Sequence, residues 1–284
     1  MWILYLSCNN RKNLELKTSI RALFTPMQPT VRQTGAEVLY HEFLPSLNLQ
    51  PYIYCYWELK TKHQLVAPFS YKVVADGCID IFFELENPQE SFVMGFCKQY
   101  TSFDLENNFH YIGIRFLPTM FPQLFQISAT ELSNKSEPLI NIIPAVAEFI
   151  EMRFNRSQNI EEIKLLLDDF FTLQVNNRPL NIDARLYNAI DIILKNFGVL
   201  NIEKDIDTGI SARQLRRLFE FYIGDTPKTF SKVVRFQNIL KAKPSSQSLK
   251  KNKLFFENGY YDQAHFIKDF KNFYGVTPAK AFGR

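Results

Sequence analysis

The sequence predicts an α+β protein in which a β-rich part is followed by an all-α part. Short, partly alternating apolar segments occupy residues 38–116, and helical periodicity runs through residues 182–284. Charge divides the chain similarly: residues 182–284 hold 18 Lys and Arg against 10 Asp and Glu, a net charge of +8, and the remaining residues hold 15 against 19. We therefore expect two domains. The basic domain is suited to a polyanionic partner; the alternative is that its basic side chains form a solvated surface without a partner.

The composition is that of a globular protein, with 46% hydrophobic and 22% charged residues. The 27 Phe residues against 10 Gly predict aromatic-rich cores. No apolar run reaches the roughly 18–20 residues of a membrane helix, and the apolar start of the chain precedes its basic pair, which is the wrong order for a secretory signal. The four cysteines lack CxxC spacing, so we expect reduced, mostly buried thiols in a cytoplasmic protein; they are Cys8, Cys55, Cys78 and Cys97.

Residues 1–30 are expected to be a loosely ordered lead-in, because polar and proline-containing stretches interrupt any periodic pattern there. Met27 is a candidate natural start. Sequencing the N-terminus of the natural protein distinguishes Met27 from Met1.

Residues 31–177 are expected to form a β-rich domain, either barrel-like or sandwich-like, with accessory helices at its end. Predicted strands include residues 52–58, 78–84, 91–96 and 111–116. Apolar residues at three- and four-residue spacing predict helices over residues 144–153 and 160–171, which would form a dimer surface or cap the sheet. The short polar stretch 174–179, ended by proline, is the predicted linker.

Residues 178–284 are expected to form an all-α domain. Its predicted helices cover residues 182–197, 211–222, 227–243, 249–257 and 262–273, followed by a short tail. Ser211 and Asp262 are placed to cap the second and last of these helices.

Two segments of this domain have similar sequence patterns. The helices that begin near Ser211 and Asp262 are both basic, each follows a glycine turn, and each is followed by a similar Tyr, Gly and Thr-Pro phrase, at residues 222–227 and 274–278. Arginine can bind guanine and glutamine can bind adenine through paired hydrogen bonds, and lysine can bind phosphate. The repeat therefore predicts two helix-turn-helix modules that bind DNA, although the first alone could be a solvated helix. The candidate contact residues are Arg213, Gln214, Arg216 and Arg217 in the first module and Gln263, His265, Lys268 and Lys271 in the second.

On these residues the chain resembles the DNA-binding domain of the AraC/XylS family of bacterial transcription regulators over residues 182–282. The strongest part is the run 259–270 followed by 274–278, and residues 234–237 are also similar. The resemblance implies two helix-turn-helix units joined by a long helix, each inserting one helix into successive major-groove segments. It places DNA contacts on Arg213, Gln214, Arg217, Gln263, His265 and Lys268.

Both supporting helices depart from the family pattern. Residues 202–209 are about one residue short and carry acidic side chains where the family favours Leu-Ala. Phe255 stands where a small alanine is usual, and Asn258 replaces an apolar residue. We therefore expect some repacking beneath each recognition helix.

The N-terminal part more weakly resembles a sensor-like β-rich domain found in some members of the family. The similar residues are 56–57, 75–82, 94–95, 114–118 and 131–132. Within them, Asp76-Gly77 is either a hairpin turn or a ligand contact, and Arg115 is either a structural ion pair or a ligand contact.

Enzyme chemistry has little support in the sequence. His41, His63 and His110 are far apart, and neither a phosphate-binding glycine loop nor a G-x-S-x-G turn occurs. We expect no catalytic residue, metal or cofactor. A metal-dependent β-barrel enzyme fused to a DNA-binding module, and a regulator whose N-terminal half only oligomerises, are the alternatives. Double-stranded DNA is the expected partner; a small-molecule effector, a second copy of the chain and RNA polymerase are compatible further partners, and no membrane partner is expected.

Overall fold

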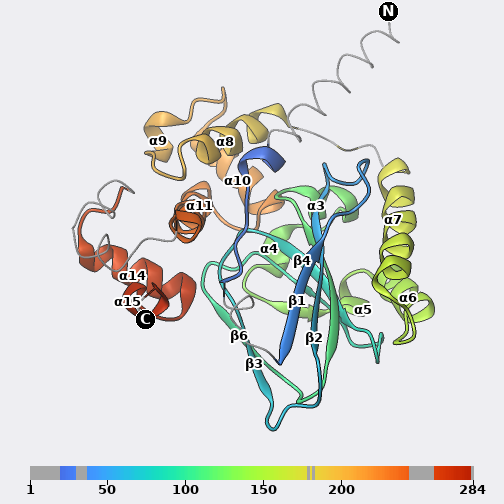
Figure 1. The fold of residues 1–284 in the computed structure, drawn as a ribbon. Coiled ribbons are helices and arrows are strands. Elements are labelled where there is room, and N and C mark those ends of the chain that lie inside the picture. Colours follow the sequence, from blue (N-terminus) through green and yellow to red (C-terminus); the bar gives the residue numbers. More distant parts are fainter. Residues whose placement is uncertain (1–19, 30–36, 178–179, 181–182, 243–258, 283–284) are drawn as a thin grey trace, which may run out of the picture.

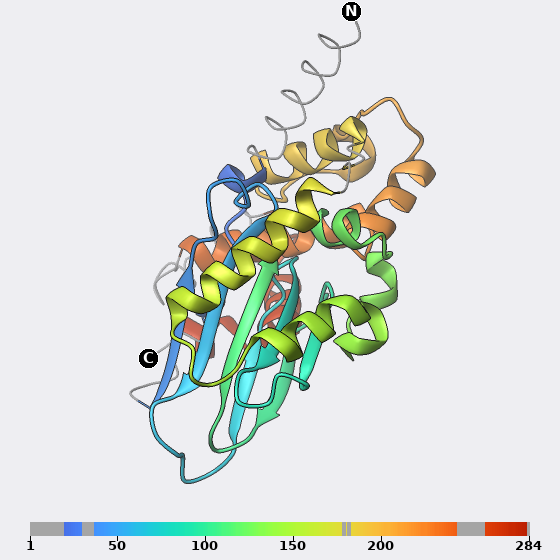
Figure 2. The same cartoon turned by 90° about the vertical axis from the view of Figure 1, so that its right-hand side faces the viewer.

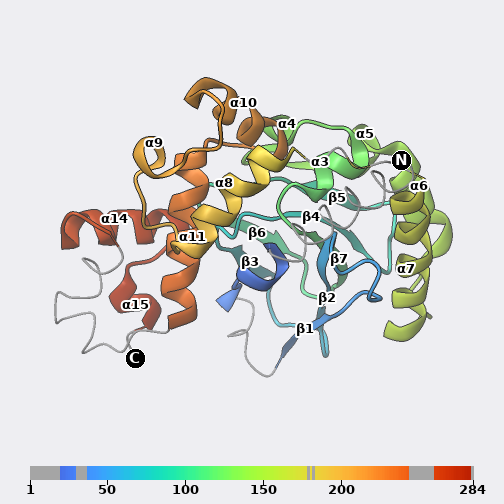
Figure 3. The same cartoon turned by 90° about the horizontal axis from the view of Figure 1, so that it is seen from above.

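The computed structural model describes residues 20–29, 37–177, 180, 183–242 and 259–282 (Figure 1). A β-rich domain and a helical domain lie side by side, with the helical domain along one flank of the sheet (Figure 3). The fold is therefore α+β, as predicted.

The β-rich domain contains a six-stranded antiparallel sheet and a separate two-stranded antiparallel ribbon. Its strands are β1 (Val38–Phe43), β2 (Ile53–Thr61), β3 (Phe69–Val73), β4 (Ile79–Glu84), β5 (Ser91–Met94), β6 (Thr101–Leu105), β7 (His110–Phe116) and β8 (Ser136–Pro138). The sheet has the order β1-β2-β7-β4-β5-β8, and the ribbon pairs β3 with β6. The four predicted strands are present as β2, β4, β5 and β7.

Alternation along the strands gives the sheet two different faces. In β4, Ile79, Ile81 and Phe83 belong to the core shared with the helices, whereas Asp80 and Phe82 lie on the face toward the ribbon. This second face carries polar and aromatic groups under the ribbon rather than under helices.

Helices cover the face of the sheet that carries Ile79, Ile81 and Phe83. α6 (Pro144–Arg153) and α7 (Ile160–Asn176) lie across it (Figure 2). The rings of Phe171 and Phe116 lie 5.7 Å apart, and the Tyr56 hydroxyl donates a 3.0 Å hydrogen bond to Asp168. Capping the sheet, one of the two roles expected for these helices, is therefore what they do here.

Several elements between the strands and these helices were not predicted. They are β8 and the short helices α3 (Met120–Phe125), α4 (Ala129–Leu132) and α5 (Leu139–Ile142). α7 also continues through Asn176, so the predicted linker at 174–179 begins inside a helix; residues 178–179 lie outside the described residues.

Residues 20–29 are packed, which differs from the loose order expected for this part of the lead-in. Phe24 is buried, and the Gln28 side chain donates to the Val74 carbonyl at 2.9 Å and to Asp76 at 2.7 Å. The Met27 amide donates to the side chain of Gln237 at 2.7 Å. Polar side chains and one buried ring hold this segment, which periodicity alone does not reveal.

Asp76 and Arg115 both have structural contacts within the β-rich domain. Arg115 is 2% exposed, and its Nη2 lies 2.9 Å from Asp80, so it forms a buried ion pair. Gly77 has a left-handed φ of 83°, and Asp76 accepts from the Cys78 amide at 2.9 Å, which closes a turn. That turn is not a hairpin, because β3 pairs with β6 and β4 pairs with β5 and β7.

The helical domain follows the predicted order. Its described helices are α8 (Ala184–Lys195), α9 (Ile202–Asp205), α10 (Ala212–Tyr222), α11 (Pro227–Ala242), α14 (Gln263–Tyr274) and α15 (Pro278–Phe282). α11 contacts α8, α10 and α14 and so forms the centre of the domain. The helix predicted over 249–257, with the departures at Phe255 and Asn258, lies outside the described residues.

Other composition-based expectations can be checked within the described ranges. Cys55, Cys78 and Cys97 are free and buried, as predicted, and Cys8 lies outside these ranges. In this part of the chain no helix is both long and apolar enough to span a membrane. Nor does it contain a cluster of three His, Cys, Asp or Glu side chains that could hold a metal ion.

Candidate nucleic-acid interface

The first predicted recognition helix, α10, is fixed at its N-terminus by a capping box. The Ser211 hydroxyl accepts from the Gln214 amide at 3.3 Å, and the Gln214 side-chain oxygen accepts from the Ser211 amide at 3.1 Å. Leu215 and Phe219 are buried on the inner face, as predicted. Gln214, expected as a DNA contact, is therefore engaged in holding the helix start.

The outer face of α10 carries the three predicted arginines, all exposed. Arg216 donates to Glu220 at 2.7 Å, one helical turn further on. Arg213 and Arg217 form no side-chain hydrogen bond or ion pair within the described parts of the chain. These two guanidinium groups are consequently free to meet an anionic or base-edge partner.

The second predicted recognition helix, α14, is capped by Asp262, which accepts from the His265 amide at 2.7 Å. This is the capping role predicted for Asp262. Phe266, Phe270 and Phe273 form the buried face, also as predicted. The expected contact residues Gln263, Lys268 and Lys271 are exposed.

His265 is more engaged than its neighbours on α14. Its Nε2 lies 3.4 Å from Asp269, and its ring meets the Tyr260 ring edge-on at 5.3 Å between centroids. Asp269 also lies 3.4 Å from the ammonium of Lys232 on α11. The structure therefore places His265 beside an acidic group that positions it, at the edge of the exposed face.

Both predicted recognition helices are held against the β-rich domain. α10 contacts α3 and α4, and the Thr130 hydroxyl donates to the Glu220 carbonyl at 2.5 Å. At the end of α14, Ala75 donates through its amide to the Phe273 carbonyl at 3.2 Å. The two helices are thus tied to different parts of the same neighbouring domain.

The end of α14 carries the densest of these contacts. The Tyr100 amide donates to the Asn272 carbonyl at 3.0 Å, and the Asn272 side chain donates to the Lys98 carbonyl at 2.8 Å. Gly275 ends the helix with a φ of 91°, and a Cβ at this position would lie 2.9 Å from the Tyr100 ring. Gly275 is therefore required both by its left-handed conformation and by the close approach of the ring.

Sequence reasoning missed the residues that make this interface. Asn272 and Thr130 carry no motif that marks them. Gln237 donates to the Ala75 carbonyl at 2.7 Å, and it ends the segment 234–237 that was noted for its resemblance. A polar side chain on the inner side of a predicted helix was the available signal.

Two parts of the chain match known protein families. Residues 207–284 match a family described as a helix-turn-helix domain, and residues 41–138 match a family described as a domain of unknown function, DUF6597. A search of the curated proteins found no match.

Three solved structures of ToxT from Vibrio cholerae are similar to the chain. An apo lysine-to-alanine variant has 11% identity, covers 87% of this chain and 97% of that chain, and gives a TM-score of 0.42. The O395 protein has 13% identity, coverages of 77% and 94%, and a TM-score of 0.39. Wild-type ToxT bound to an unsaturated fatty acid has 12% identity, coverages of 88% and 96%, and a TM-score of 0.36.

Residues 207–284 thus form a helix-turn-helix domain, within which both predicted modules lie. This domain is joined to a β-rich N-terminal domain, as the sequence predicted.

Proposed function

We propose that this protein is a sequence-specific transcription regulator whose helices α10 and α14 enter adjacent major-groove segments of one DNA duplex. The observation that carries the proposal is the pairing of two capped helices, each with a buried aromatic face and an exposed face bearing basic side chains. A major groove admits an α-helix, and its base edges distinguish all four base pairs.

The structure supports different roles for the candidate residues. Arg213 and Arg217 are exposed and have no partner within the described chain, so they suit base or phosphate contacts on α10. Gln263 and Lys268 have the corresponding exposed positions on α14. We assign supporting roles to the remaining candidates. Gln214 holds the helix start, Arg216 and Lys271 contribute positive charge, and His265 contacts the DNA backbone.

We further propose that the β-rich domain modulates DNA binding by setting how the two recognition helices lie. The contacts of α10 with α3 and α4, and of α14 with residues 75, 98 and 100, support this role. A change in the β-rich domain would reach both helices through these bonds. Because chromosomal DNA is the proposed partner, we place the protein in the compartment that holds it, the bacterial cytoplasm.

Selection from fragmented genomic DNA with the purified full-length protein tests the proposal. We expect recovery of a few related sites, bound by the protein at least about 1,000-fold more tightly than random DNA. Recovery of unrelated fragments with equal affinities would contradict sequence-specific binding.

A further inference from the structure

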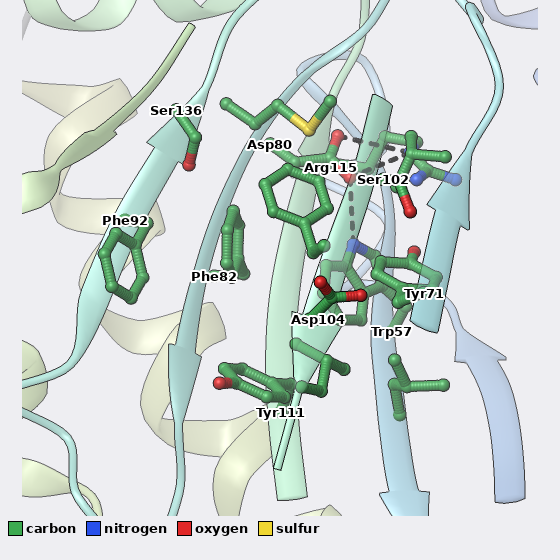
Figure 4. A pocket seen from close by; sticks show the side chains of 15 residues that line it. Trp57, Tyr71, Asp80, Phe82, Phe92, Ser102, Asp104, Tyr111, Arg115 and Ser136 are labelled. Atoms are coloured by element: carbon green, nitrogen blue, oxygen red, sulfur yellow. Dashed lines mark hydrogen bonds and ion pairs between the residues drawn. The ribbon is translucent and has the colours of Figure 1, made fainter. Parts of the chain in front are cut away.

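A cavity of about 390 Å³ lies between the six-stranded sheet and the β3–β6 ribbon (Figure 4). Its walls are largely aromatic and come from both layers: Trp57, Phe82, Phe92 and Tyr111 from the sheet, and Tyr71 and Phe103 from the ribbon. This volume suits a small organic molecule.

Phe82 is the centre of the aromatic wall. Its ring centroid lies 5.5 Å from that of Phe92, 6.2 Å from those of Trp57 and Tyr111, and 6.4 Å from that of Phe103. Aromatic faces carry partial negative charge, so a ring of this kind attracts a cation placed over it.

The position of Trp57 depends on the residue opposite it in β7. A Cβ at Gly113 would lie 1.9 Å from the indole of Trp57, so only glycine leaves room for that ring. In this position the indole Nε1 donates to Asp80 at 3.0 Å. The absence of a side chain at Gly113 thus places an aromatic face and a carboxylate together on the cavity wall.

The fixed charges around the cavity favour a positive ligand. Arg115 is the one cationic side chain among the described lining residues, and its Nε and Nη2 both donate to Asp80. Two more carboxylates share it: Asp76 lies 3.6 Å from Nε and Glu42 lies 3.9 Å from Nη1. Three carboxylates therefore surround one guanidinium, and Asp104 adds a further negative charge at the rim.

Asp80 is unfavourably buried even though it accepts hydrogen bonds from both Arg115 and Trp57. Burial raises its pKa to about 6, although Arg115 acts in the opposite direction, and the charge of Asp76 raises it further. A positively charged ligand in the cavity would relieve this unfavourable burial of negative charge. One observation points the other way. Nη1 of Arg115 has no hydrogen-bond acceptor within the described protein, so it would favour an anion.

We infer that this cavity binds an organic cation, an ammonium group with an apolar body, over the Trp57 and Phe82 rings and close to Asp80. A cation is favoured over an anion because the negatively charged carboxylates around the cavity outnumber its one positively charged side chain, Arg115. An organic anion bound by Nη1 of Arg115 is the competing occupant.

The site has a direct connection to α14. β3 leads to Ala75, whose amide bonds to Phe273, and Tyr100, whose amide bonds to Asn272, immediately precedes β6. Both bonds therefore join α14 to chain ends of the ribbon that covers the cavity. This regulatory consequence rests on the proposed function, whereas cation binding itself does not.

Calorimetry on the full-length protein without DNA tests the site, with benzyltrimethylammonium as the cationic probe and phenylacetate as an anionic probe of similar size. We expect benzyltrimethylammonium to bind at least about tenfold more tightly than phenylacetate. Equal binding of the two probes, preference for phenylacetate, or binding of neither would overturn the inference.

Two variants and a control localise the site. Asp80→Asn and Phe82→Leu should each weaken binding of the cation by about fivefold or more, because one removes the carboxylate and the other removes an aromatic face. The control, Asp169→Asn, removes an exposed carboxylate on α7 and should bind as the wild type does. If Asp80→Asn does not fold, because Arg115 loses its partner, Phe82→Leu decides, and wild-type affinity in Phe82→Leu would contradict the site.

The connection to α14 is tested separately by measuring the Kd for DNA with and without saturating benzyltrimethylammonium. A change of at least about threefold is expected. An unchanged Kd would overturn the coupling, and failure to bind DNA at all would count against the proposed function instead.

Discussion

The backbone amide of Tyr100 donates a 3.0 Å hydrogen bond to the carbonyl oxygen of Asn272, so the β-rich domain is bonded to the last turn of α14, the second proposed recognition helix. The Asn272 side chain strengthens the junction by donating to the Lys98 carbonyl at 2.8 Å. One residue of α14 thus holds both ends of a short segment that precedes β6. This junction gives the β-rich domain a direct means of acting on α14.

Asn272→Ala should loosen this junction. The substitution removes the bond to Lys98 and leaves the backbone bond to Tyr100, so we expect faster hydrogen exchange of the Tyr100 amide and a loss of stability of about 1 kcal/mol. Asn238→Ala is the control, because its side chain donates to the Val234 carbonyl at 3.1 Å within α11. Equal exchange at Tyr100 in both variants would show that Asn272 does not hold the junction.

Gln214→Ala should act on the stability of α10. The variant loses half of the capping box with Ser211, and we expect the free energy of unfolding to fall by about 0.5–1 kcal/mol in urea titrations. Gln214→Glu keeps an acceptor for the Ser211 amide and should retain most of the stability. The capping role is wrong if Gln214→Ala is as stable as the wild type.

Lys268→Ala should weaken DNA binding in a salt-dependent manner. If Lys268 contacts a phosphate, the slope of log K against log salt should decrease by about one, and affinity should fall for all sequences alike. Lys62→Ala, an exposed lysine of the β-rich domain, should leave the slope unchanged. An unaltered slope in Lys268→Ala would remove this residue from the phosphate contacts.

Glu58 should make the stability of the β-rich domain depend on pH. Burial acts to raise its pKa, but hydrogen bonds from His110 and Lys60 outweigh burial, and the pKa lies below its ordinary value. A carboxyl with a lowered folded-state pKa stabilises the fold above its unfolded-state pKa, and this stabilisation is lost as pH falls through the folded-state pKa.

We therefore expect Glu58→Gln to be less stable than the wild type by about 1–2 kcal/mol near neutral pH, with the difference shrinking below about pH 4. Urea unfolding at several pH values measures this difference. The exposed Glu131→Gln is the control. A difference that stays constant down to about pH 3 would exclude the ionised Glu58 as its source.

The sequence predicted those parts of the fold that local patterns encode. Alternation marked β4 and β7, and the caps at Ser211 and Asp262 marked the starts of the two basic helices, since each pattern reflects a repeat of two or 3.6 residues. The Ser211-x-x-Gln214 spacing was itself a capping-box signature, so the structural role of Gln214 was readable in advance.

The ribbon and the domain junction could not be predicted in this way. β3 and β6 are separated along the chain by β4 and β5, which belong to the other sheet. Apolar residues alternate with polar ones in β3, but alternation does not specify which strand is its partner. The bond between Tyr100 and Asn272 uses backbone atoms only, which every residue possesses. The packing of the two domains against each other determines which backbone groups form this bond, and no local sequence pattern indicates that packing.

DNA affinity of the double variant Arg217→Ala/Lys268→Ala, measured at about 150 mM salt on a selected genomic site, tests the central claim most directly. The control is Arg156→Ala/Lys62→Ala, which removes the same two charges from exposed positions of the β-rich domain. The first variant changes one residue on each of α10 and α14, so its affinity for DNA should fall at least about 100-fold. The affinity of the control should remain near the wild-type value. Equal affinities of the two double variants would contradict DNA recognition by α10 and α14.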